Sequence, residues 1–260
     1  MRKIILLKNK TTPTDLYETY FSSNAFQPVF VPLIKHTHIP SETLELLQDN
    51  EYLTDLRYII ITSQRTVECL NESIIPKLSM EHRELLLSKV IYTVGPATQR
   101  FLKNCVFKDV RGGEETGNGS LLADYIADQL LVQPNREPST YGHLLFLVGE
   151  IRRDIIPKKL AAVGLNVKEV VTYKTEDLED NLTRFRSVCD AGSWVVIFSP
   201  QGTKDILEYL KVTNTTRVVS IGPTTQKYLE SNGLKPDLVS SKPEPVSLLK
   251  EIKNDAVSFC

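Results

Sequence analysis

The sequence VGPATQRFL, residues 94–102, returns as IGPTTQKYL at residues 221–229. Each copy follows an apolar run and opens a stretch with helical periodicity. Each is also followed, at the same distance, by Ser-Leu-Leu, at residues 120–122 and 247–249. This recurrence indicates that the chain consists of two tandem halves of similar structure.

Two further pairs of segments extend the repeat. Residues 58–65 (YIIITSQR) resemble residues 195–202 (VVIFSPQG), and residues 3–8 (KIILLK) are weakly echoed by residues 143–148 (HLLFLV). In both halves, small and hydroxyl-bearing residues stand where the apolar runs end. The sequence therefore favours two similar lobes that face one ligand.

The composition restricts the class of protein. The chain has 260 residues, 41% of them hydrophobic, and a net charge of -1, so it lacks the basic field that binds nucleic acid or an anionic membrane. No apolar run approaches the roughly 20 residues that a spanning helix needs, and the first residues are too short a segment for a signal peptide. Four scattered cysteines fit reduced thiols better than disulfides or a zinc site. We therefore expect a cytoplasmic protein without nucleic-acid or membrane partners.

Short β-branched runs alternate with stretches of helical periodicity along the whole chain. This alternation predicts an α/β fold with parallel sheets, right-handed crossovers and helices on both faces. Gly164 and Gly233 stand where helices are expected to end, as C-cap glycines do. Strands are expected at residues 3–7, 28–33, 58–62, 90–94, 144–148, 167–173, 194–198 and 218–221, with weaker ones at 106–110 and 238–240; helices are expected at residues 66–78, 97–104, 121–130, 154–163, 203–211 and 225–232.

Two domain divisions fit this pattern. A boundary at the turn-rich segment 133–142 would separate the two sequence repeats. Alternatively, the chain crosses between lobes at the extended stretches 31–37 and 171–177, so that one lobe is assembled from both ends of the chain. The pattern alone does not choose between them.

The loops after the strands are the expected place for a ligand, because open parallel sheets bind ligands beyond the carboxyl ends of their strands. These loops combine small residues with hydroxyls and lead into helices, whose first N–H groups and dipoles attract anions. A ligand with several anionic groups would suit them, although each hydroxyl taken singly is explained well by helix capping. The loops are residues 62–65, 95–98, 149–153, 199–202 and 222–225.

Four side chains near these strand ends are candidates for chemistry. Tyr173 ends a strand where the chain is expected to cross, so its phenol is placed to donate a proton or a hydrogen bond; a half-buried strand aromatic is the alternative interpretation. Arg65, Arg152 and Arg153 offer guanidinium groups to carboxylates, or are solvated charges on helix surfaces. The acidic run 176–180 is interpreted as the solvated start of a helix.

The motifs of several enzyme classes are absent from the sequence. It has no G-x-S-x-G elbow, no Walker loop and no G-x-G-x-x-G after the first strand. His36 and His38 have no evident third ligand, so we expect neither a metal site nor a cofactor. The glycine-rich run 112–119 lacks a strong preceding strand and is interpreted as a plain loop.

The order and spacing of these segments over the whole length resemble the uroporphyrinogen-III synthase family. Pro96 and Gln64 stand where some members carry other residues. The resemblance is carried by residues 62–68 (TSQRTVE), 92–98 (YTVGPAT), 149–157 (GEIRRDIIP), 171–175 (VTYKT), 198–202 (FSPQG) and 221–225 (IGPTT).

The resemblance implies two flavodoxin-like α/β lobes joined by a two-stranded linker, with the chain crossing twice. The first lobe would comprise residues 1–34 and 177–260, and the second lobe residues 35–172. The linker strands would lie near residues 31–37 and 171–177.

The resemblance also implies a reaction, the cyclisation of the linear tetrapyrrole hydroxymethylbilane to uroporphyrinogen III, on the way to haem, with loss of water and inversion of the last ring. Loss of the terminal hydroxyl gives an azafulvene that the pyrrole nitrogens stabilise, so the enzyme mainly controls geometry. Tyr173 falls on the family tyrosine thought to assist departure of hydroxide. The cleft hydroxyl positions fall on Ser63, Thr98, Ser199, Thr224 and Thr225, and a basic position falls on Arg153; Arg65 and the backbone of Gly222 complete the expected substrate contacts.

Other functions remain open from the residues themselves. A two-lobed, non-catalytic binder of an anionic small molecule would use the same loops, but Tyr173 favours chemistry. An enzyme for phosphosugars would need a catalytic Glu or His in a strand-end loop, and none stands out. Besides the tetrapyrrole, we expect a transient contact with the preceding enzyme of the pathway.

Overall fold

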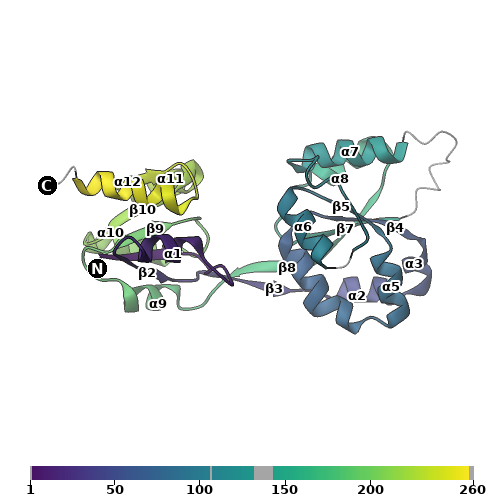
Figure 1. The fold of residues 1–260 in the computed structure, drawn as a ribbon, viewed down its shortest axis with the longest axis horizontal. Helices are drawn as coiled ribbons and strands as arrows, with labels where there is room; N and C mark the ends of the chain where they lie inside the picture. Colours follow the sequence, from purple (N-terminus) through teal and green to yellow (C-terminus); the bar gives the residue numbers. More distant parts are fainter. Residues whose placement is uncertain (1, 106, 132–142, 258–260) are drawn as a thin grey trace. The chain divides into compact units, whose positions relative to one another are not determined.

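The computed structural model describes residues 2–105, 107–131 and 143–257, so the expected seam at residues 133–142 lies outside the described part. The chain forms two compact units (Figure 1). Unit 1 comprises Met1–Lys35 with Glu176–Cys260, and unit 2 comprises His36–Thr175. The N-terminal segment therefore folds with the last third of the chain.

Unit 1 is built around a five-stranded sheet in the order β11-β10-β9-β1-β2, in which all neighbours are parallel. Its elements are β1 (Arg2–Leu7), α1 (Leu16–Ser22), β2 (Phe26–Phe30), α9 (Asn181–Val188), β9 (Trp194–Ile197), α10 (Lys204–Thr213), β10 (Arg217–Ile221), α11 (Gly222–Ser231), β11 (Leu238–Ser240) and α12 (Pro245–Val257). Successive residues of β1 point to opposite faces: Ile4 and Leu6 pack against α1 and α12, while Ile5 and Leu7 pack against α9 and α10. Both faces of the sheet are thus covered.

Unit 2 is built around a six-stranded sheet in the order β3-β8-β7-β4-β5-β6. Its elements are β3 (Ile34–His38), α2 (Ser41–Gln48), α3 (Asn50–Asp55), β4 (Leu56–Ile61), α4 (Gln64–Cys69), the π-helix η1 (Leu70–Ile74), the 3-10 helix η2 (Ile75–Lys77), α5 (Met80–Leu87), β5 (Val90–Thr93), α6 (Pro96–Asn104), β6 (Asp109–Arg111), α7 (Gly119–Leu131), β7 (His143–Gly149), α8 (Ile155–Ala162) and β8 (Val167–Asp177). The chain passes between the units within β3 and again within β8, which are neighbours in this sheet.

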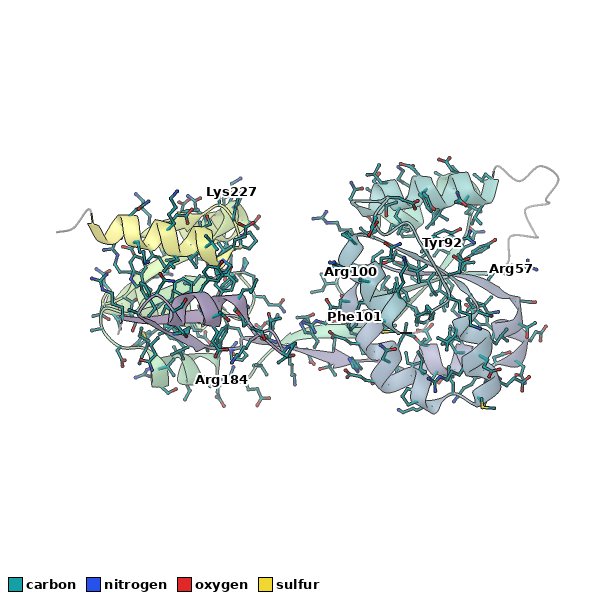
Figure 2. The ribbon with its side chains drawn as sticks, viewed as in Figure 1. Arg57, Tyr92, Arg100, Phe101, Arg184 and Lys227 are labelled. Carbon is teal, nitrogen blue, oxygen red and sulfur yellow. The ribbon has the colours of Figure 1, made fainter. Side chains whose placement is uncertain are left out.

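The core of unit 2 also has two layers, one on each face of its sheet. Ile59 and Ile61 of β4 pack among residues of α2 to α6, whereas Ile60 points to the side covered by α7 and α8. Tyr92, labelled in Figure 2, is fully buried on the latter side, with its ring centroid 6.3 Å from that of Tyr125 on α7. Burial raises the pKa of Tyr92 to about 12, so this phenol is a neutral part of the core.

The repeated sequence segments occupy equivalent places in the two sheets. Strands β1, β9, β10 and β11 of unit 1 stand where β7, β4, β5 and β6 stand in unit 2, and these are the pairs that the repeat aligns. Strands β2 and β8 complete the correspondence. Each unit therefore takes two of these five strands from one half of the sequence and three from the other, so the sequence halves do not coincide with the folded units.

The predicted α/β class is confirmed, and every expected strand overlaps an observed one. Gly164 and Gly233 follow helix ends with φ of +81° and +78°, as predicted for C-caps. Helices α1, α2, α3, α5 and α12 were not expected. Most of these are short, and tertiary packing of residues such as Phe21, Leu47 and Leu86 stabilises them more than their own propensity does.

Two segments differ in part from what the sequence predicts. The helix expected at residues 66–78 changes from α-helix to π-helix to 3-10 helix along its length. Only the end of the acidic run 176–180 reaches a helix, because β8 continues to Asp177 and Asp180 is the N-cap residue of α9, which begins at Asn181. Strand pairing with β3 extends β8 beyond the point where its apolar residues end. None of the described helices is both long and apolar enough to span a bilayer.

Candidate active site

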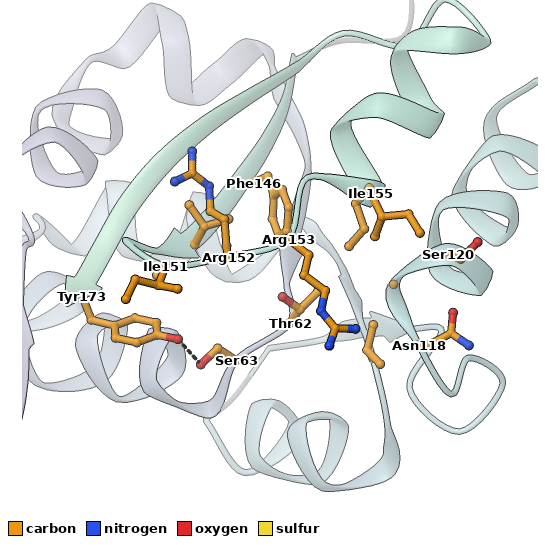
Figure 3. Close-up of a pocket in the computed structure, with 15 residues that line it drawn as sticks. Thr62, Ser63, Asn118, Ser120, Phe146, Ile151, Arg152, Arg153, Ile155 and Tyr173 are labelled. Atoms are coloured by element: carbon orange, nitrogen blue, oxygen red, sulfur yellow. Dashed lines mark hydrogen bonds between the residues drawn. The ribbon is translucent and has the colours of Figure 1, made fainter. Parts of the chain in front are cut away.

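The order of the strands in unit 2 reverses between β4 and β7. Strands β5 and β6 follow β4 on one side, and β8 follows β7 on the other. Ligands bind at such a switch point because the loops that leave the two central strands diverge there. A cavity of about 650 Å³ occupies this place (Figure 3). It is lined by Thr62, Ser63, Val94, Asn118, Gly119, Ser120, Phe146, Val148, Gly149, Ile151, Arg152, Arg153, Ile155, Ile156 and Tyr173.

A pair of hydroxyl groups lies at one end of the cavity. Ser63 caps α4, and its Oγ accepts a hydrogen bond from the backbone N–H of Arg65 at 3.2 Å. The Ser63 hydroxyl in turn donates to Tyr173 Oη at 3.0 Å, the dashed line in Figure 3. A hydroxyl has one hydrogen to donate, so the hydrogen of Tyr173 remains available to a molecule in the cavity.

Tyr173 reaches this position because Gly149 has no side chain. The register between β7 and β8 shifts after Val148, which places Tyr173 opposite Gly149. A Cβ on Gly149 would lie 2.6 Å from Cζ of Tyr173 and 2.7 Å from its hydroxyl oxygen. The backbone N–H of Glu150 also donates to the Tyr173 carbonyl at 2.9 Å. The glycine and this hydrogen bond together fix where the phenol lies.

His36 lies at the edge of the same tyrosine ring. The two ring centroids are 6.3 Å apart and the rings are nearly perpendicular, at 76°. Its Nδ1 is 3.0 Å from Oγ1 of Thr175. Burial, followed by the nearby Arg65 guanidinium, lowers the pKa of His36. The imidazole is therefore neutral at neutral pH and places no charge beside the phenol.

The three arginines that the sequence singled out have different surroundings. Arg65 does not line the cavity, since its guanidinium pairs with both carboxylate oxygens of Glu68 at 2.9 and 2.7 Å. Arg152 lines the cavity but donates to Glu169 at 2.9 Å, and this hydrogen bond raises the pKa of Arg152. Arg153 lines the cavity and has no ion-pair partner among the described residues. It is the arginine of the lining that is free to meet an anion.

The remaining predicted residue of unit 2, Thr98, is half-buried on α6 and is not part of the lining. The loop before it is occupied by protein contacts, because the Gly95 N–H donates to the Thr116 carbonyl at 3.1 Å. Oγ1 of Thr116 in turn donates to the Thr93 carbonyl at 3.2 Å. The structure thus brings Ser63, Arg153 and Tyr173 together in one cavity and leaves Arg65 and Thr98 outside it.

The predicted residues of unit 1 lie at the carboxyl edge of its own sheet. Ser199 and Thr224 are exposed, whereas Thr225 is 3% exposed and donates to the Phe198 carbonyl at 3.2 Å. Gly222 has a φ of +76°, matching +77° at Gly95, and a Cβ on either would meet no atom within 4 Å. The repeat therefore preserves a left-handed glycine with open space around it in both units.

The switch point of unit 1 lies between β1 and β9, and Lys8, the residue that follows β1, lies there beside aromatic side chains. Lys8 Nζ lies 5.1 Å from the ring centroid of Tyr17, 5.5 Å from that of Phe30 and 5.9 Å from that of Phe198. It also pairs with Asp15, which is 1% exposed. The ammonium group of Lys8, beside these three rings and Asp15, thus lies at the place that corresponds to the cavity of unit 2.

Sequence reasoning missed several residues of the cavity. Asn118 and Ser120 line it and lie outside every expected loop. Thr62 and Ile151 also line it; they belong to the expected loops 62–65 and 149–153 but were not singled out, and Ile151 is 81% exposed. The run at residues 112–119, interpreted as a plain loop, supplies Asn118 and Gly119; its available signal was Gly-Asn-Gly directly before a helix. Within the described residues, no group of His, Cys, Asp or Glu is arranged to hold a metal ion.

The family of the chain follows from its sequence relatives. The sequence model of the family described as uroporphyrinogen-III synthase HemD matches residues 15–250. The chain belongs to this enzyme family. A uroporphyrinogen-III synthase of Saccharomyces cerevisiae is 54% identical over 264 residues, with coverage of 96% of this chain and 95% of the relative. A uroporphyrinogen-III synthase of Schizosaccharomyces pombe is 32% identical over 255 residues, with coverage of 97% and 96%.

Solved structures of uroporphyrinogen-III synthases share the fold. The uroporphyrinogen-III synthetase of Helicobacter pylori 26695 has a TM-score of 0.65 at 21% identity, with both chains covered completely. A mutant uroporphyrinogen III synthase of the extremely thermophilic bacterium Thermus thermophilus has a TM-score of 0.52 at 15% identity, with 98% of this chain and 99% of that chain covered. At these identities the likeness supports the two-lobed α/β fold alone.

Proposed function

We propose that this chain cyclises hydroxymethylbilane to uroporphyrinogen III, with loss of water and inversion of the last pyrrole ring. Membership of the uroporphyrinogen-III synthase family supports this activity over that of a non-catalytic binder. The structural observation that carries the proposal is the Ser63–Tyr173 hydroxyl pair at the end of the unit 2 cavity. It provides one oriented proton donor in a site suited to a large, anionic ligand.

The first step is departure of the terminal hydroxyl group of the substrate. The C–O bond breaks as the electron pair of the adjacent pyrrole nitrogen forms the azafulvene cation, and Tyr173 donates its proton to the leaving oxygen, so that water departs and a phenolate remains. Ser63 donates to Tyr173 Oη at 3.0 Å, which stabilises the negative charge that develops on the phenol oxygen. Burial and the nearby Arg65 lower the pKa of His36, so this imidazole is a weak base for the same proton.

The second step is ring closure: the azafulvene carbon bonds to the substituted carbon of the last pyrrole and gives a spiro intermediate. The original bond from that carbon to its bridging carbon then breaks, and the bridging carbon bonds to the unsubstituted carbon, which inverts the ring. The proton lost from that carbon as the pyrrole is restored returns the Tyr173 phenolate to the phenol.

Uncatalysed closure attacks the unsubstituted carbon and gives the uninverted isomer. The enzyme therefore has to hold the chain of pyrroles in one conformation, which is catalysis by orientation. The apolar wall of Val94, Phe146, Val148 and Ile156 suits a pyrrole face, and Arg153 suits a carboxylate of its side chains.

The remaining predicted contacts belong to the same proposal. Ser199, Thr224 and the open backbone at Gly222 would bind further substrate carboxylates from unit 1. Thr225 would act by holding the Phe198 carbonyl, since its hydroxyl is buried and donates there. Thr98 and Arg65 would act from outside the cavity lining, Arg65 through its ion pair with Glu68.

We also infer the setting of the reaction. The cysteines Cys69, Cys105 and Cys189 are free thiols, which fits a reducing, cytoplasmic compartment. The substrate closes spontaneously to the wrong isomer, so a transient contact with the enzyme that produces it would limit this loss. Both statements are tested by fractionation of cells and by cross-linking during turnover.

One assay decides the activity. The purified chain is supplied with hydroxymethylbilane, and the products are oxidised and separated by chromatography into type I and type III isomers. We expect the type III isomer to dominate with the enzyme and the type I isomer without it. Type I product alone, or bound but unconverted substrate, would overturn the proposal in favour of a binder.

A further inference from the structure

The end of the unit 2 cavity opposite Tyr173 is formed by Asn118, Gly119 and Ser120 (Figure 3). No predicted site residue lies there. Its two polar side chains are held by neighbouring protein groups, and these contacts decide which of their atoms remain for a ligand. Both are left as hydrogen-bond donors.

The amide of Asn118 is oriented by the start of α7. Its Oδ1 accepts a hydrogen bond from the Leu121 N–H at 3.0 Å, while its own carbonyl accepts from the Leu122 N–H at 3.0 Å. The acceptor atom of the side chain is therefore engaged. Its Nδ2 makes no hydrogen bond to any described residue, so the group that remains is a two-hydrogen donor.

The hydroxyl of Ser120 is oriented by α8. Nζ of Lys159 donates to Ser120 Oγ at 3.0 Å and is itself held by Asp124 at 2.6 Å. A hydroxyl that accepts from an ammonium group directs its own hydrogen elsewhere. Ser120 is half-buried on the cavity lining, so it too is available as a donor.

Arg153 adds a positive charge to the same cavity. Its side chain extends from the β7–α8 loop toward the part of the lining that carries Asn118 in Figure 3. Between this end and the hydroxyl pair lies the apolar ring of Phe146 (Figure 3). The cavity thus has an apolar side chain in its middle, a proton donor at one end and, at the other, two side chains with hydrogen atoms to donate.

We propose that Asn118 and Ser120 form a carboxylate subsite that positions the acetate or propionate side chain of a pyrrole ring seated in the unit 2 cavity. The inference rests on the proposed function for the identity of the ring, and the chemistry recognised is a carboxylate on an apolar heteroaromatic. Tyr173 touches the reacting group, whereas Asn118 and Ser120 act by fixing the ring relative to it.

Asn118→Asp tests the subsite with little disturbance of the fold. The aspartate keeps the oxygen that accepts from the Leu121 N–H and is an equally good cap, but it replaces the free donor with a negative charge. Ser79→Asp is the matched control, because Ser79 caps α5 through the His82 N–H, is exposed and does not line the cavity. Thermal unfolding of both variants verifies that they are folded.

Two readouts separate the subsite from the activity. We expect Asn118→Asp to raise KM for hydroxymethylbilane about 10- to 100-fold, as expected for loss of a hydrogen bond to a charged group, with kcat changed far less. Binding of uroporphyrin III, the oxidised form of the proposed product, should weaken by a similar factor. Coproporphyrin III, in which methyl groups replace the acetates, shows which carboxylate is bound. If the subsite binds an acetate, wild type and Asn118→Asp should bind coproporphyrin III equally well. If it binds a propionate, Asn118→Asp should weaken coproporphyrin III binding by the same factor as uroporphyrin III binding.

The results that overturn the subsite differ from those that overturn the reaction. Uroporphyrin affinity and KM within twofold of wild type in folded Asn118→Asp would exclude the subsite even if wild type makes the type III isomer. If Ser79→Asp weakens uroporphyrin binding by the same factor, general repulsion by an added negative charge explains the result, and the subsite is also excluded. Conversely, a wild-type protein that makes no type III isomer but loses uroporphyrin affinity on Asn118→Asp keeps the subsite and loses the proposed reaction.

Discussion

The switch points of the two units have the same strand arrangement, but different side chains lie at them. In unit 2, the place between β4 and β7 is a cavity of about 650 Å³ lined by hydroxyls, glycines and Arg153. In unit 1, the equivalent place between β1 and β9 holds Lys8, paired with Asp15 and surrounded by three aromatic rings. In the sequence repeat, Lys8 aligns with Val148 of the cavity lining.

This difference separates what the repeat preserves from what it does not. The left-handed glycines, strand order and helix starts recur because they are properties of the backbone. The contents of the crevice depend on a few side chains and have diverged. We infer that the proton donor belongs to unit 2, whereas in unit 1 the equivalent place is taken by the Lys8–Asp15 pair.

Cutting the chain at the seam between the two sequence halves should have the largest effect, since it separates strands that belong to one sheet. Because each unit takes strands from both halves, residues 1–134 and 141–260 should each lack a cooperative unfolding transition when expressed alone. Co-expression should restore a folded complex. The experiment is chemical denaturation followed by circular dichroism.

A fragment of residues 36–175 is the control for this cut. It contains the whole of unit 2 and should fold alone, since it has its own core. Two stable halves, each with a cooperative transition, would contradict the exchange of strands between them.

Tyr173→Phe tests the functional side of the comparison. The ring and its packing opposite Gly149 are kept, and only the hydroxyl is lost. The rate of type III formation should fall about 10²- to 10⁴-fold, the usual contribution of a general acid, with little change in the melting temperature. Steady-state kinetics with product separation measures it, and an unchanged rate in folded protein would exclude Tyr173 as the acid.

Asp15→Asn tests whether the Lys8–Asp15 pair of unit 1 stabilises the fold. Burial would raise the pKa of Asp15, but hydrogen bonds from Lys8 and from the Thr11 and Tyr17 N–H groups outweigh it and the pKa is lowered. A carboxylate with a lowered folded pKa stabilises the protein above its unfolded pKa, near 3.9, and this contribution is lost as the pH falls through the folded value.

The variant should therefore unfold more easily by about 1–3 kcal/mol at pH 7, the range for hydrogen bonds to a charged group. The difference from wild type should shrink below about pH 4. Denaturant titrations at pH 7 and pH 3 check both statements. A difference that is independent of pH would mean that packing, and not charge, stabilises this part of unit 1.

Ser199→Ala should have the smallest effect. Ser199 is exposed on a unit 1 loop, so water can replace its hydroxyl at a substrate carboxylate. Its loss should therefore cost only about 0.5–1.5 kcal/mol of binding, below the range for a hydrogen bond to a charged group. We expect KM to rise by no more than about tenfold, since 1.4 kcal/mol is a factor of ten, and kcat to stay unchanged. Loss of all activity in the folded variant would place a reacting group in unit 1 and remove the distinction between the two units.

The sequence predicts the fold well where the pattern is periodic and buried. Strand β4 and the two Gly-Pro helices have strong local signals, and these were correct. Helices such as α3 and α5 lack such signals, because packing of Leu53 and Leu86 stabilises them and packing partners come from distant segments. The acidic end of β8 shows the same limit: strand pairing with β3 extended it where its composition favoured a helix.

The candidate site was predictable only in part, for a related reason. Ser63 and Arg153 follow strand ends, and Tyr173 was expected to end a strand, so their proximity in a parallel sheet can be anticipated. In the structure β8 continues past Tyr173 to Asp177. Asn118 follows the short strand β6 after a long loop, and its place on the cavity depends on how that loop packs, with Thr116 buried beneath Gly95. Likewise, Tyr173 has room beside Gly149 only because of a shift in the strand register, and no sequence pattern predicts this shift.

The exchange of strands between the two halves of the sequence delays the folding of unit 1 during synthesis. β1 pairs with β2 on one side and with β9 on the other, but about 160 residues separate the end of β2 from the start of β9. At the usual pace of translation this gap lasts roughly 10–30 s. During that time the apolar edge of β1 has no partner, while the ribosome completes all of unit 2. The nascent chain therefore carries an open strand edge that chaperones must shield, and unit 1 can close only after its last third has left the ribosome.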